Sequence, residues 1–252
     1  MSNPMQVALV TGASRGIGHA TAAHLASKGF ALFLAADGTA AELTAVATHC
    51  QRLGAPEVAF GMFDLSRPGT AEAMVAAAVT RFGRVDVLVN VAGLRCQKPF
   101  GHFTQADFDL LMAVNVGGAF FASQAVLPAM RAQGGGRIIH VASQMGSVAA
   151  PMNTIYGMTK AALIRLAKSM ALELSADNIL VNTVSPGPIA TDFINNRYAG
   201  DPAARAAMER MVPMGRFGTP EEIAEVIGFL ATSQGRFLQG ADLLVDGGYL
   251  VH

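Results

Sequence analysis

The chain has 252 residues, of which 52% are apolar and 14% charged, and eighteen basic residues balance eighteen acidic ones. No linker, charge block or repeat divides it, so we expect a single domain over residues 1–252. The zero net charge and the lack of a basic stripe give no support to nucleic-acid binding, and the small charged fraction predicts subunit interfaces beside a large core.

The amino-terminal residues carry no secretory pattern, because MSNPMQ leads directly into an apolar run without a basic segment or cleavage site. No uninterrupted apolar stretch reaches the ~18 residues needed to cross a bilayer. The two cysteines, Cys50 and Cys96, fit reduced thiols better than a disulfide framework. We therefore expect a cytoplasmic protein that does not enter a membrane.

Short apolar runs alternate along the chain with longer, alanine-rich stretches. The strand candidates are residues 6–11, 31–36, 57–61, 85–90, 136–142, 179–184 and 242–246. The helix candidates are residues 16–28, 40–53, 69–82, 105–133, 154–176 and 220–232. The strand runs are continuous rather than alternating, as in strands that helices cover on both faces. This order predicts an α/β fold with a doubly wound parallel sheet of seven strands, which binds ligands at the carboxyl ends of its strands.

Glycines are expected to end several of the predicted helices. Gly29 and Gly54 are expected to end the first two, and the run from Gly134 to Gly136 is expected to end the fourth. Asp107 and Asp109 are better explained as the opening of a helix, where the helix dipole favours acids, than as a hydrolytic pair.

The first strand candidate ends in TGASRGIG, residues 11–18. Gly12 can form a tight turn, Gly16 lets the backbone approach a pyrophosphate, and the N-terminus of the following helix supplies free N–H groups and a partial positive charge. A glycine-rich turn without a ligand is the alternative, but the strand–loop–helix context is what a dinucleotide-binding motif requires. No Gly-Lys-Ser/Thr follows, so this is not a nucleotide-hydrolase phosphate loop.

A carboxylate follows the second strand at Asp37, 19 residues beyond Gly18. At this spacing an acid can accept hydrogen bonds from the ribose hydroxyls of NAD and repel the extra phosphate of NADP. The alternative is a turn or capping residue, since Gly38 and Thr39 begin the next connection.

The stretch IYGMTK places Tyr156 and Lys160 four positions apart on one face of a predicted helix. A free tyrosine titrates near ~10 and is a poor acid or base at neutral pH, whereas a nearby cation can change that. The pair alone does not separate a tuned acid/base from an ordinary buried aromatic.

With these motifs in place, the chain resembles the short-chain dehydrogenase/reductase family over essentially its whole length. The matching segments are TGASRGIG, Asp64-Leu65 after the third strand, NVAG at 90–93, SPGPIAT at 185–191 and VDGG at 245–248. The resemblance implies a Rossmann-like fold with NAD(P). It assigns cofactor binding to Gly12, Ser14, Arg15, Gly16, Ile17, Gly18, Asp37, Asp64, Leu65, Asn90, Ala92, Gly93, Tyr156, Lys160, Pro186, Gly187, Ile189 and Thr191.

The same resemblance implies a catalytic tetrad of Asn115, Ser143, Tyr156 and Lys160. Tyr156 would be the general acid/base, with its pKa lowered by Lys160 and by the positive nicotinamide. Ser143 would hydrogen-bond the substrate oxygen, Lys160 would also hold the nicotinamide ribose, and Asn115 would fix a water that joins Lys160 to solvent. Thr191 would bind the nicotinamide carboxamide. Four unrelated residues at these spacings would be an improbable coincidence.

The sequence departs from the family pattern at the cofactor. Val91 replaces a common second asparagine, and the strand is expected to tolerate it. Arg15 is a feature often associated with NADP, whereas Asp37 stands where NADP-preferring members often carry a basic residue, and Ala36 where NAD-preferring members often carry their acid. Because a carboxylate facing a phosphate is costly and Arg15 can turn to solvent, we favour NAD, with NADP possible.

Residues 188–214 are expected to form a substrate lid, with Met208, Met211 and Val212 more readily explained as its core than as substrate contacts. The predicted pocket residues are Leu94, Arg95, Gln144, Met145, Phe193 and Tyr198. Arg95 would meet an anionic substrate or be a solvated charge, the second being the simpler explanation. The six histidines show no metal spacing, so we expect no metal. Cys96 lies near the expected mouth of the active site, but nothing nearby suggests an activated thiolate, so we expect no nucleophilic cysteine.

Taken together, these features predict an oxidoreductase that transfers a hydride between a nicotinamide cofactor and a secondary alcohol or ketone. One alternative is an NADPH-dependent 3-oxoacyl-[acyl-carrier-protein] reductase. Another, of a different class, is a non-catalytic cofactor sensor or regulatory protein. The resemblance also implies a homotetramer, with the helices at 105–133 and 154–176 between subunits.

Overall fold

Within residues 5–251, which the computed structural model describes, seven strands form one parallel sheet in the order β3-β2-β1-β4-β5-β6-β7. The strands are β1 (Val7–Thr11), β2 (Ala31–Ala36), β3 (Val58–Met62), β4 (Val87–Asn90), β5 (Gly136–Val141), β6 (Ile179–Pro186) and β7 (Asp242–Val245). The order reverses on either side of β1, which is the arrangement expected of a doubly wound sheet. The predicted fold class is confirmed.

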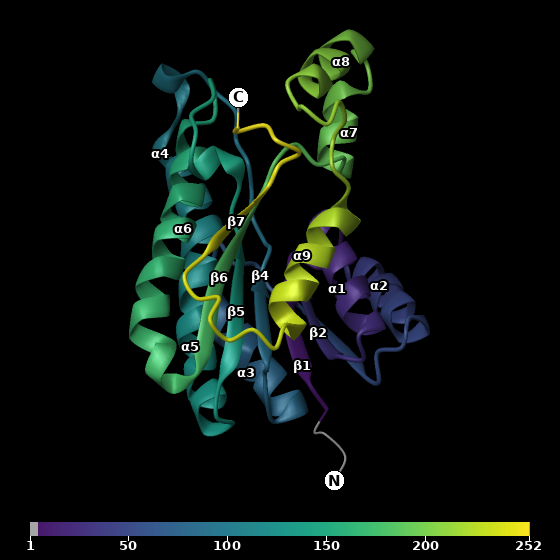
Figure 1. Ribbon diagram of the computed structural model, residues 1–252, viewed down its shortest axis with the longest axis vertical. Helices are drawn as coiled ribbons and strands as arrows, with labels where there is room; N and C mark the ends of the chain where they lie inside the picture. The colour runs from purple at the N-terminus through teal and green to yellow at the C-terminus, as the bar shows by residue number, and fades with distance from the viewer. Residues whose placement is uncertain (1–4, 252) are drawn as a thin grey trace.

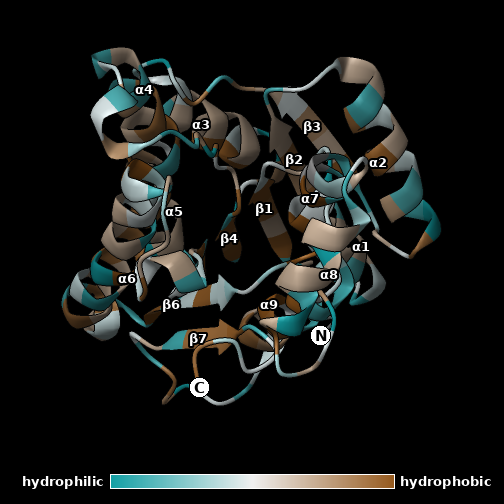
Figure 2. Cartoon of the chain, turned by 90° about the horizontal axis from the view of Figure 1, so that it is seen from above, coloured by the Kyte–Doolittle hydropathy of each residue, from teal (hydrophilic) through white to brown (hydrophobic). Residues whose placement is uncertain are grey.

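Helices cover both faces of the sheet (Figures 1 and 2). The α-helices are α1 (Gly16–Ser27), α2 (Ala40–Arg52), α3 (Thr70–Phe82), α4 (Gln105–Leu111), α5 (Gly118–Ala132), α6 (Thr154–Leu174), α7 (Asp192–Tyr198), α8 (Pro202–Arg210) and α9 (Pro220–Thr232). One face carries α1, α2 and α9, and the other carries α3, α5 and α6. In Figure 1, α7 and α8 stand above the upper, carboxyl edge of the sheet.

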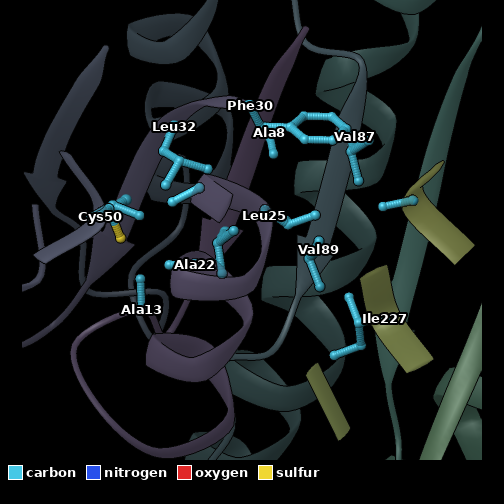
Figure 3. Packing of buried hydrophobic residues seen from close by; sticks show 14 of the residues in the cluster. Ala8, Ala13, Ala22, Leu25, Phe30, Leu32, Cys50, Val87, Val89 and Ile227 are labelled. Atoms are coloured by element: carbon cyan, nitrogen blue, oxygen red, sulfur yellow. The ribbon is translucent and has the colours of Figure 1, made fainter. Parts of the chain in front are cut away.

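The core lies between the sheet and these two helical layers. On the first face Leu25 of α1 and Ile227 of α9 pack with strand residues such as Ala8 and Val89, all buried (Figure 3). On the second face Met130 of α5 and its neighbours pack with residues of β4, β5 and β6. Every residue of β1, β2, β4 and β6 is buried, which explains their continuous apolar runs.

The two edge strands differ from that expectation. β3 and β7 are only partly buried, with Met62 59% exposed, because each pairs with one neighbour and is covered less completely. β6 also runs to Pro186, two residues beyond the predicted end. β5 begins at Gly136, the first residue of the predicted strand, while α5 ends at Ala132 before the glycine run.

The predicted helix boundaries agree within two residues except in the fourth helix and the lid. Gly29 and Gly54 follow α1 and α2 at positive φ angles of 81° and 109°, as predicted for helix-terminating glycines. Asp107 opens α4 in a capping box with Thr104, also as predicted. The predicted lid contains α7 and α8, two short helices that the sequence pattern did not predict.

The fourth predicted helix is not one regular helix. A π-helical segment, η2 (Met112–Gly117), separates α4 from α5. Among the described residues, this continuous stretch from Gln105 to Ala132 is the one helix long and apolar enough to cross a membrane. Ala122, Val126 and Met130 are nevertheless buried against the sheet, and packing in a core layer accounts for such an apolar helix.

A buried polar row crosses the sheet beneath its carboxyl edge. Asn90, His140 and Thr183 pair in register on β4, β5 and β6. The Asn90 amide nitrogen contacts His140 Nδ1 at 3.2 Å and donates to Ser123 Oγ at 3.3 Å. Burial, reinforced by the positive charge of Lys160, lowers the pKa of His140 from 6.5 to about 4. His140 is therefore held neutral at the pH values where an unfolded histidine is protonated.

His140 should make the fold sensitive to acid. The unfolded chain binds the His140 proton near pH 6.5 and the folded chain only near pH 4, so the free energy of unfolding falls as pH falls through that window. The total loss is about 3 kcal/mol. Denaturant titrations of the parent and His140→Asn, at pH values across the window, should show a steeper decline for the parent.

The exposed His102→Asn variant is the matched control and should follow the parent. If His140→Asn lost stability with acid as steeply as the parent, the buried neutral histidine would not be the cause.

Candidate active site

A cavity of about 510 Å³ lies at the carboxyl ends of β1, β2 and β4. Its size suits a small-molecule or cofactor site. Twelve residues predicted from the sequence line it: Gly12, Ser14, Arg15, Ile17, Gly18, Asp37, Asp64, Leu65, Ala92, Gly93, Leu94 and Thr191. Most of the predicted cofactor-binding residues are thus brought together by the fold.

The loop between β1 and α1 leaves room for backbone alone. Gly12 has a φ of 64°, and a Cβ there would lie 2.9 Å from Ala92 Cα. A Cβ on Gly18 would overlap the carbonyl oxygen of Gly12. Arg15 occupies the N-cap position of α1 but its side chain makes no capping hydrogen bond. Backbone N–H groups at this helix start therefore face the cavity as donors for an anion, which fits the pyrophosphate of a dinucleotide.

Two carboxylates mark the far end of the cavity. The Asp64 carboxylate accepts hydrogen bonds from the Ser66 hydroxyl and backbone N–H and from Arg67 Nε, and these bonds lower its pKa. Asp37 is exposed at the end of β2 and lines the cavity beside Arg15. This end of the cavity can thus distinguish cofactors by charge.

Tyr156 and Lys160 both lie on α6, beneath the segment that follows β4. The buried Lys160 donates from Nζ to the carbonyl oxygen of Val141, the last residue of β5, at 2.8 Å. Its Nζ is 5.7 Å from the centroid of the Tyr156 ring. It also comes within 3.4 Å of where a Cβ on Gly93 would stand. Because Gly93 lines the cavity, the lysine adjoins it.

Ser143 faces the tyrosine from the end of β5. Its side chain hydrogen-bonds that of Tyr156 and also accepts from the Met145 N–H at 3.1 Å. A Cβ on Gly146 would lie 2.8 Å from Ile164 Cδ1 and 2.9 Å from the carbonyl carbon of Lys160. The turn that carries Ser143 therefore rests directly on α6.

Asn115 lies in the π-helical segment η2, where the extra residue in the turn directs it inward. Its Oδ1 accepts from the Leu94 N–H at 2.7 Å, and its Nδ2 donates to the Leu94 carbonyl at 2.9 Å and to Thr159 Oγ1 at 3.0 Å. The side chain thus fixes the segment after β4 against α6. Its predicted role in holding a water remains a prediction.

The electrostatics of Tyr156 differ from the sequence expectation. Burial raises the pKa of Tyr156 above its ordinary value, while Arg95 and the hydrogen bond with Ser143 lower it. Lys160 was expected to lower the Tyr156 pKa together with the positive nicotinamide, yet burial lowers the pKa of Lys160 itself to about 8. The cation that acts most strongly on Tyr156 in this structure is Arg95, whose Cζ is 5.3 Å from the ring centroid.

Comparisons with known proteins agree with this geometry. A family model described as Enoyl-(Acyl carrier protein) reductase matches residues 12–250. The chain is 41% identical to L-rhamnose 1-dehydrogenase (NAD(P)(+)) of Azotobacter vinelandii, over 97% of this chain and 96% of that protein. It is 36% identical to D-threitol dehydrogenase of Mycolicibacterium smegmatis, over 98% and 93%.

Solved structures match as closely. A variant of a Serratia marcescens short-chain dehydrogenase/reductase superposes with a TM-score of 0.90 at 37% identity, over 98% of this chain and 99% of that one. The chain is a short-chain dehydrogenase/reductase. A 3-oxoacyl (acyl-carrier-protein) reductase from Agrobacterium tumefaciens with NADP bound superposes with a TM-score of 0.92 at 33% identity, over 97% and 94%.

As a member of this family, the protein is an NAD(P)-dependent oxidoreductase that acts on CH–OH groups. Within residues 5–251, no group of three or more His, Cys, Asp or Glu side chains could hold a metal ion.

Several predicted residues of this dehydrogenase/reductase lie outside the lining of the large cavity. The Asn90 side chain points to Ser123 and His140 instead. Gly187 packs against the backbone of Asp246, where a Cβ would come within 2.6 Å of its Cα, and Ile189 forms a β-bridge to Gly218. Pro186 ends β6. These residues support the strand ends, and their cofactor contacts remain predictions.

The predicted substrate pocket is only partly assembled. Gln144 is 2% exposed, and its Oε1 has no hydrogen-bond partner among the described residues, whereas Met145 is half-buried. The ring of Tyr198 lies 6.1 Å from that of Phe217. Phe193 lies in α7, and its side chain is outside the described part of the structure.

The side chains predicted to form the core of residues 188–214 differ in burial. Val212 is buried, as the prediction of a lid core requires, whereas Met211 is 48% exposed. A Cβ on Gly247 would lie 2.8 Å from Val212 Cγ1, so this end of the lid packs on the segment that follows β7.

Two important residues were missed by the sequence analysis. Thr11, at the end of β1, accepts with Oγ1 from the N–H groups of both Val91 and Ala92 at 3.0 Å, and so holds the ends of β1 and β4 together. Asn153 is buried and accepts from Arg95 Nε at 2.8 Å. The position of Thr11 at a strand end was a usable signal, whereas nothing in the local pattern marked Asn153.

The contact of Gly146 with α6 gives a test of the site geometry. The methyl group of Gly146→Ala would displace the Ser143 turn from α6, so we expect turnover to fall by about 10- to 100-fold with little change in cofactor affinity. Gly101→Ala is the matched control, because nothing lies within 4 Å of the added methyl. Equal turnover in the two variants would show that the close approach of the turn to α6 is not needed.

Proposed function

We propose that the protein interconverts a secondary alcohol and a ketone, with Tyr156 as the general acid/base. The observation that carries this proposal is the position of Tyr156, between Ser143 at the end of β5 and Lys160 on the same helix, next to the cavity. The hydrogen bond between the side chains of Ser143 and Tyr156 supports the proposal that both bind one substrate oxygen. Geometry of this kind supports acid–base catalysis before any pKa is considered.

In the oxidative direction, the phenolate of Tyr156 takes the proton from the substrate hydroxyl while Ser143 donates a hydrogen bond to the same oxygen. The bound nicotinamide supplies the hydride acceptor. Lys160 favours the phenolate by its charge and keeps its own place through the bond to Val141. In the reductive direction the neutral Tyr156 returns the proton to the forming alkoxide.

We propose a small polyhydroxylated substrate, such as a sugar or a polyol. The support is the similarity to proteins named as L-rhamnose and D-threitol dehydrogenases. A 3-oxoacyl-thioester reductase is the second candidate, supported by the NADP-bound reductase structure and by Arg15. The third candidate, a non-catalytic cofactor sensor, does not explain why the four residues of the tetrad are present.

We propose NAD as the preferred cofactor. Arg15, which would attract a 2′-phosphate, lies beside two acids rather than one. Asp37 lines the same end of the cavity, and the charge of Glu42 interacts with that of Arg15. Glu42 is itself held by the capping box with Thr39. The two carboxylates outweigh the single cation, and this favours a ribose hydroxyl over a phosphate dianion.

We propose a cytoplasmic homotetramer in which α4, α5 and α6 pack between subunits. The support is a set of large apolar side chains that these helices leave exposed: Phe108, Leu110, Phe120, Phe121, Met158 and Leu172. Apolar surface of this extent is usually covered by a partner. Light scattering of the purified protein measures the subunit number, and a monomer at micromolar concentration would contradict the proposal.

Tyr156→Phe tests the catalytic proposal. Sugars, diols and hydroxy acids would first be screened with NAD, and ketones and oxoacyl thioesters with NADPH. With a substrate so found, the variant should lose about 10²- to 10⁴-fold in kcat because it has no transferable proton. Calorimetric affinity for the cofactor, measured on the same preparation, should stay near that of the parent. Surviving turnover would refute Tyr156 as the acid/base.

Parallel calorimetric titrations with NADH and NADPH test the cofactor proposal. The parent should bind NADH at least about tenfold more tightly, and Asp37→Asn should reduce that preference by about tenfold because a repulsive charge is removed. Asp177→Asn, whose carboxylate pairs with Arg131 in a different part of the fold, is the control and should keep the parent's ratio. Tighter NADPH binding by the parent would mean that Arg15 dominates.

A further inference from the structure

Two cations, from different parts of the chain, face the ring of Tyr156. Lys160 comes from α6 itself, with Nζ 5.7 Å from the ring centroid. Arg95 comes from the segment after β4, with Cζ at 5.3 Å. Both distances are within the range of a cation–π interaction, and a cation that is attracted to a phenol ring is attracted more strongly to the phenolate.

Arg95 is held in this place by Asn153, at the cost of a helix cap. Asn153 occupies the N-cap position of α6, and asparagine is among the residues that best cap a helix, yet its side chain makes no capping hydrogen bond. Its Oδ1 accepts instead from Arg95 Nε at 2.8 Å and from Gln97 Nε2 at 3.2 Å. Its Nδ2 donates to the Pro151 carbonyl at 2.7 Å. The buried Asn153 amide thus hydrogen-bonds Arg95 instead of capping α6.

The surrounding backbone reinforces this arrangement. The Lys98 N–H donates to the Met152 carbonyl, so the segment after β4 is joined to the turn before α6 a second time. Met152 adopts a φ of 64°, an uncommon conformation for a residue with a side chain. A strained turn that presents a buried anchor is a feature of functional sites rather than of simple connections.

Lys160 alone is a limited source of charge. Burial lowers its pKa to about 8, so it loses its proton in the alkaline range where alcohol oxidation is favoured. A guanidinium keeps its charge at every such pH. Among the residues that the structure describes, the charged groups that face Tyr156 are Arg95 from the segment after β4 and Lys160 from α6, with Ser143 adding a neutral hydroxyl from the end of β5.

We propose that Arg95 is a positioning residue for Tyr156: anchored by Asn153, it fixes the phenol ring and supplies a permanent positive charge that favours the phenolate. This assigns to Arg95 a role in the chemistry rather than in binding an anionic substrate or in solvation. It deepens the proposed function, because the proton acceptor would then remain available after Lys160 has become neutral.

The composition of the chain permits a direct test. With three tyrosines and no tryptophan, the near-ultraviolet absorbance of phenolate can be followed against pH, and subtracting the curve of Tyr156→Phe isolates Tyr156. In Arg95→Gln, which keeps an amide donor but loses the charge, the midpoint should rise by about one pH unit, a tenfold change in the ionisation constant. Arg95→Lys keeps the charge and should stay near the parent.

Asn153→Ala is the second variant, since it keeps both cations but frees the arginine, and its midpoint should also rise. Far-ultraviolet circular dichroism at each pH separates ionisation from unfolding. The proposal is overturned if Arg95→Gln titrates with the parent, or if Arg95→Lys shifts as far as Arg95→Gln.

The titration uses neither substrate nor cofactor, so it fails independently of the proposed function. A shifted midpoint together with an active Tyr156→Phe would retain the role of Arg95 and discard Tyr156 as the acid/base. An unshifted midpoint with an inactive Tyr156→Phe would do the reverse.

Discussion

A single hydrogen bond, from the buried Lys160 ammonium to the carbonyl of Val141, connects the helix that carries Tyr156 to the centre of the sheet. A lysine is rarely buried without a partner, because its charge loses the solvation of water. Here the partner is the last carbonyl of β5, at the edge where parallel strands leave their ends unpaired. This bond fixes the end of α6 that carries the tyrosine, while Ala167, Ala171 and Leu174 pack the rest of the helix against the sheet.

Other polar groups lie close to Lys160. Asn115 and Thr159 tie η2 and the segment after β4 to α6, at the residue next to the lysine. On the other side, the positive field adds to burial in keeping His140 neutral. The region beneath the site therefore buries many polar groups, which costs free energy of folding. The apolar clusters on both faces of the sheet supply the stability that offsets this cost.

Sequence reasoning succeeded where structure is determined locally. The run at 31–36 is a buried strand at the predicted residues, and Gly29 and Gly54 end helices because they tolerate positive φ. The cavity gathers the residues of TGASRGIG with Asp37 and Asp64, since strand ends in a parallel sheet meet at one edge. Family resemblance supplied the roles of the tetrad, which residue spacing alone left open.

What escaped prediction depends on contacts between distant segments. The partial exposure of β3 follows from its place at the sheet edge, which its sequence does not encode. Asn153 looks like an ordinary helix cap until Arg95, 58 residues earlier, is seen to occupy its side-chain oxygen. For the same reason Lys160 was the one side chain expected to act with the nicotinamide on Tyr156, because its spacing from Tyr156 is visible in the sequence and that of Arg95 is not.

The π-helical turn at Met112–Gly117 has a consequence for how this enzyme can diverge. One surplus residue in the turn lets Asn115 face Leu94 while α4 and α5 both keep their outer surfaces in place. Deleting a residue there would restore a regular helix but rotate everything on one side of it by about 100°. The side chains of that turn can therefore be exchanged without this rotation, whereas its length cannot be changed.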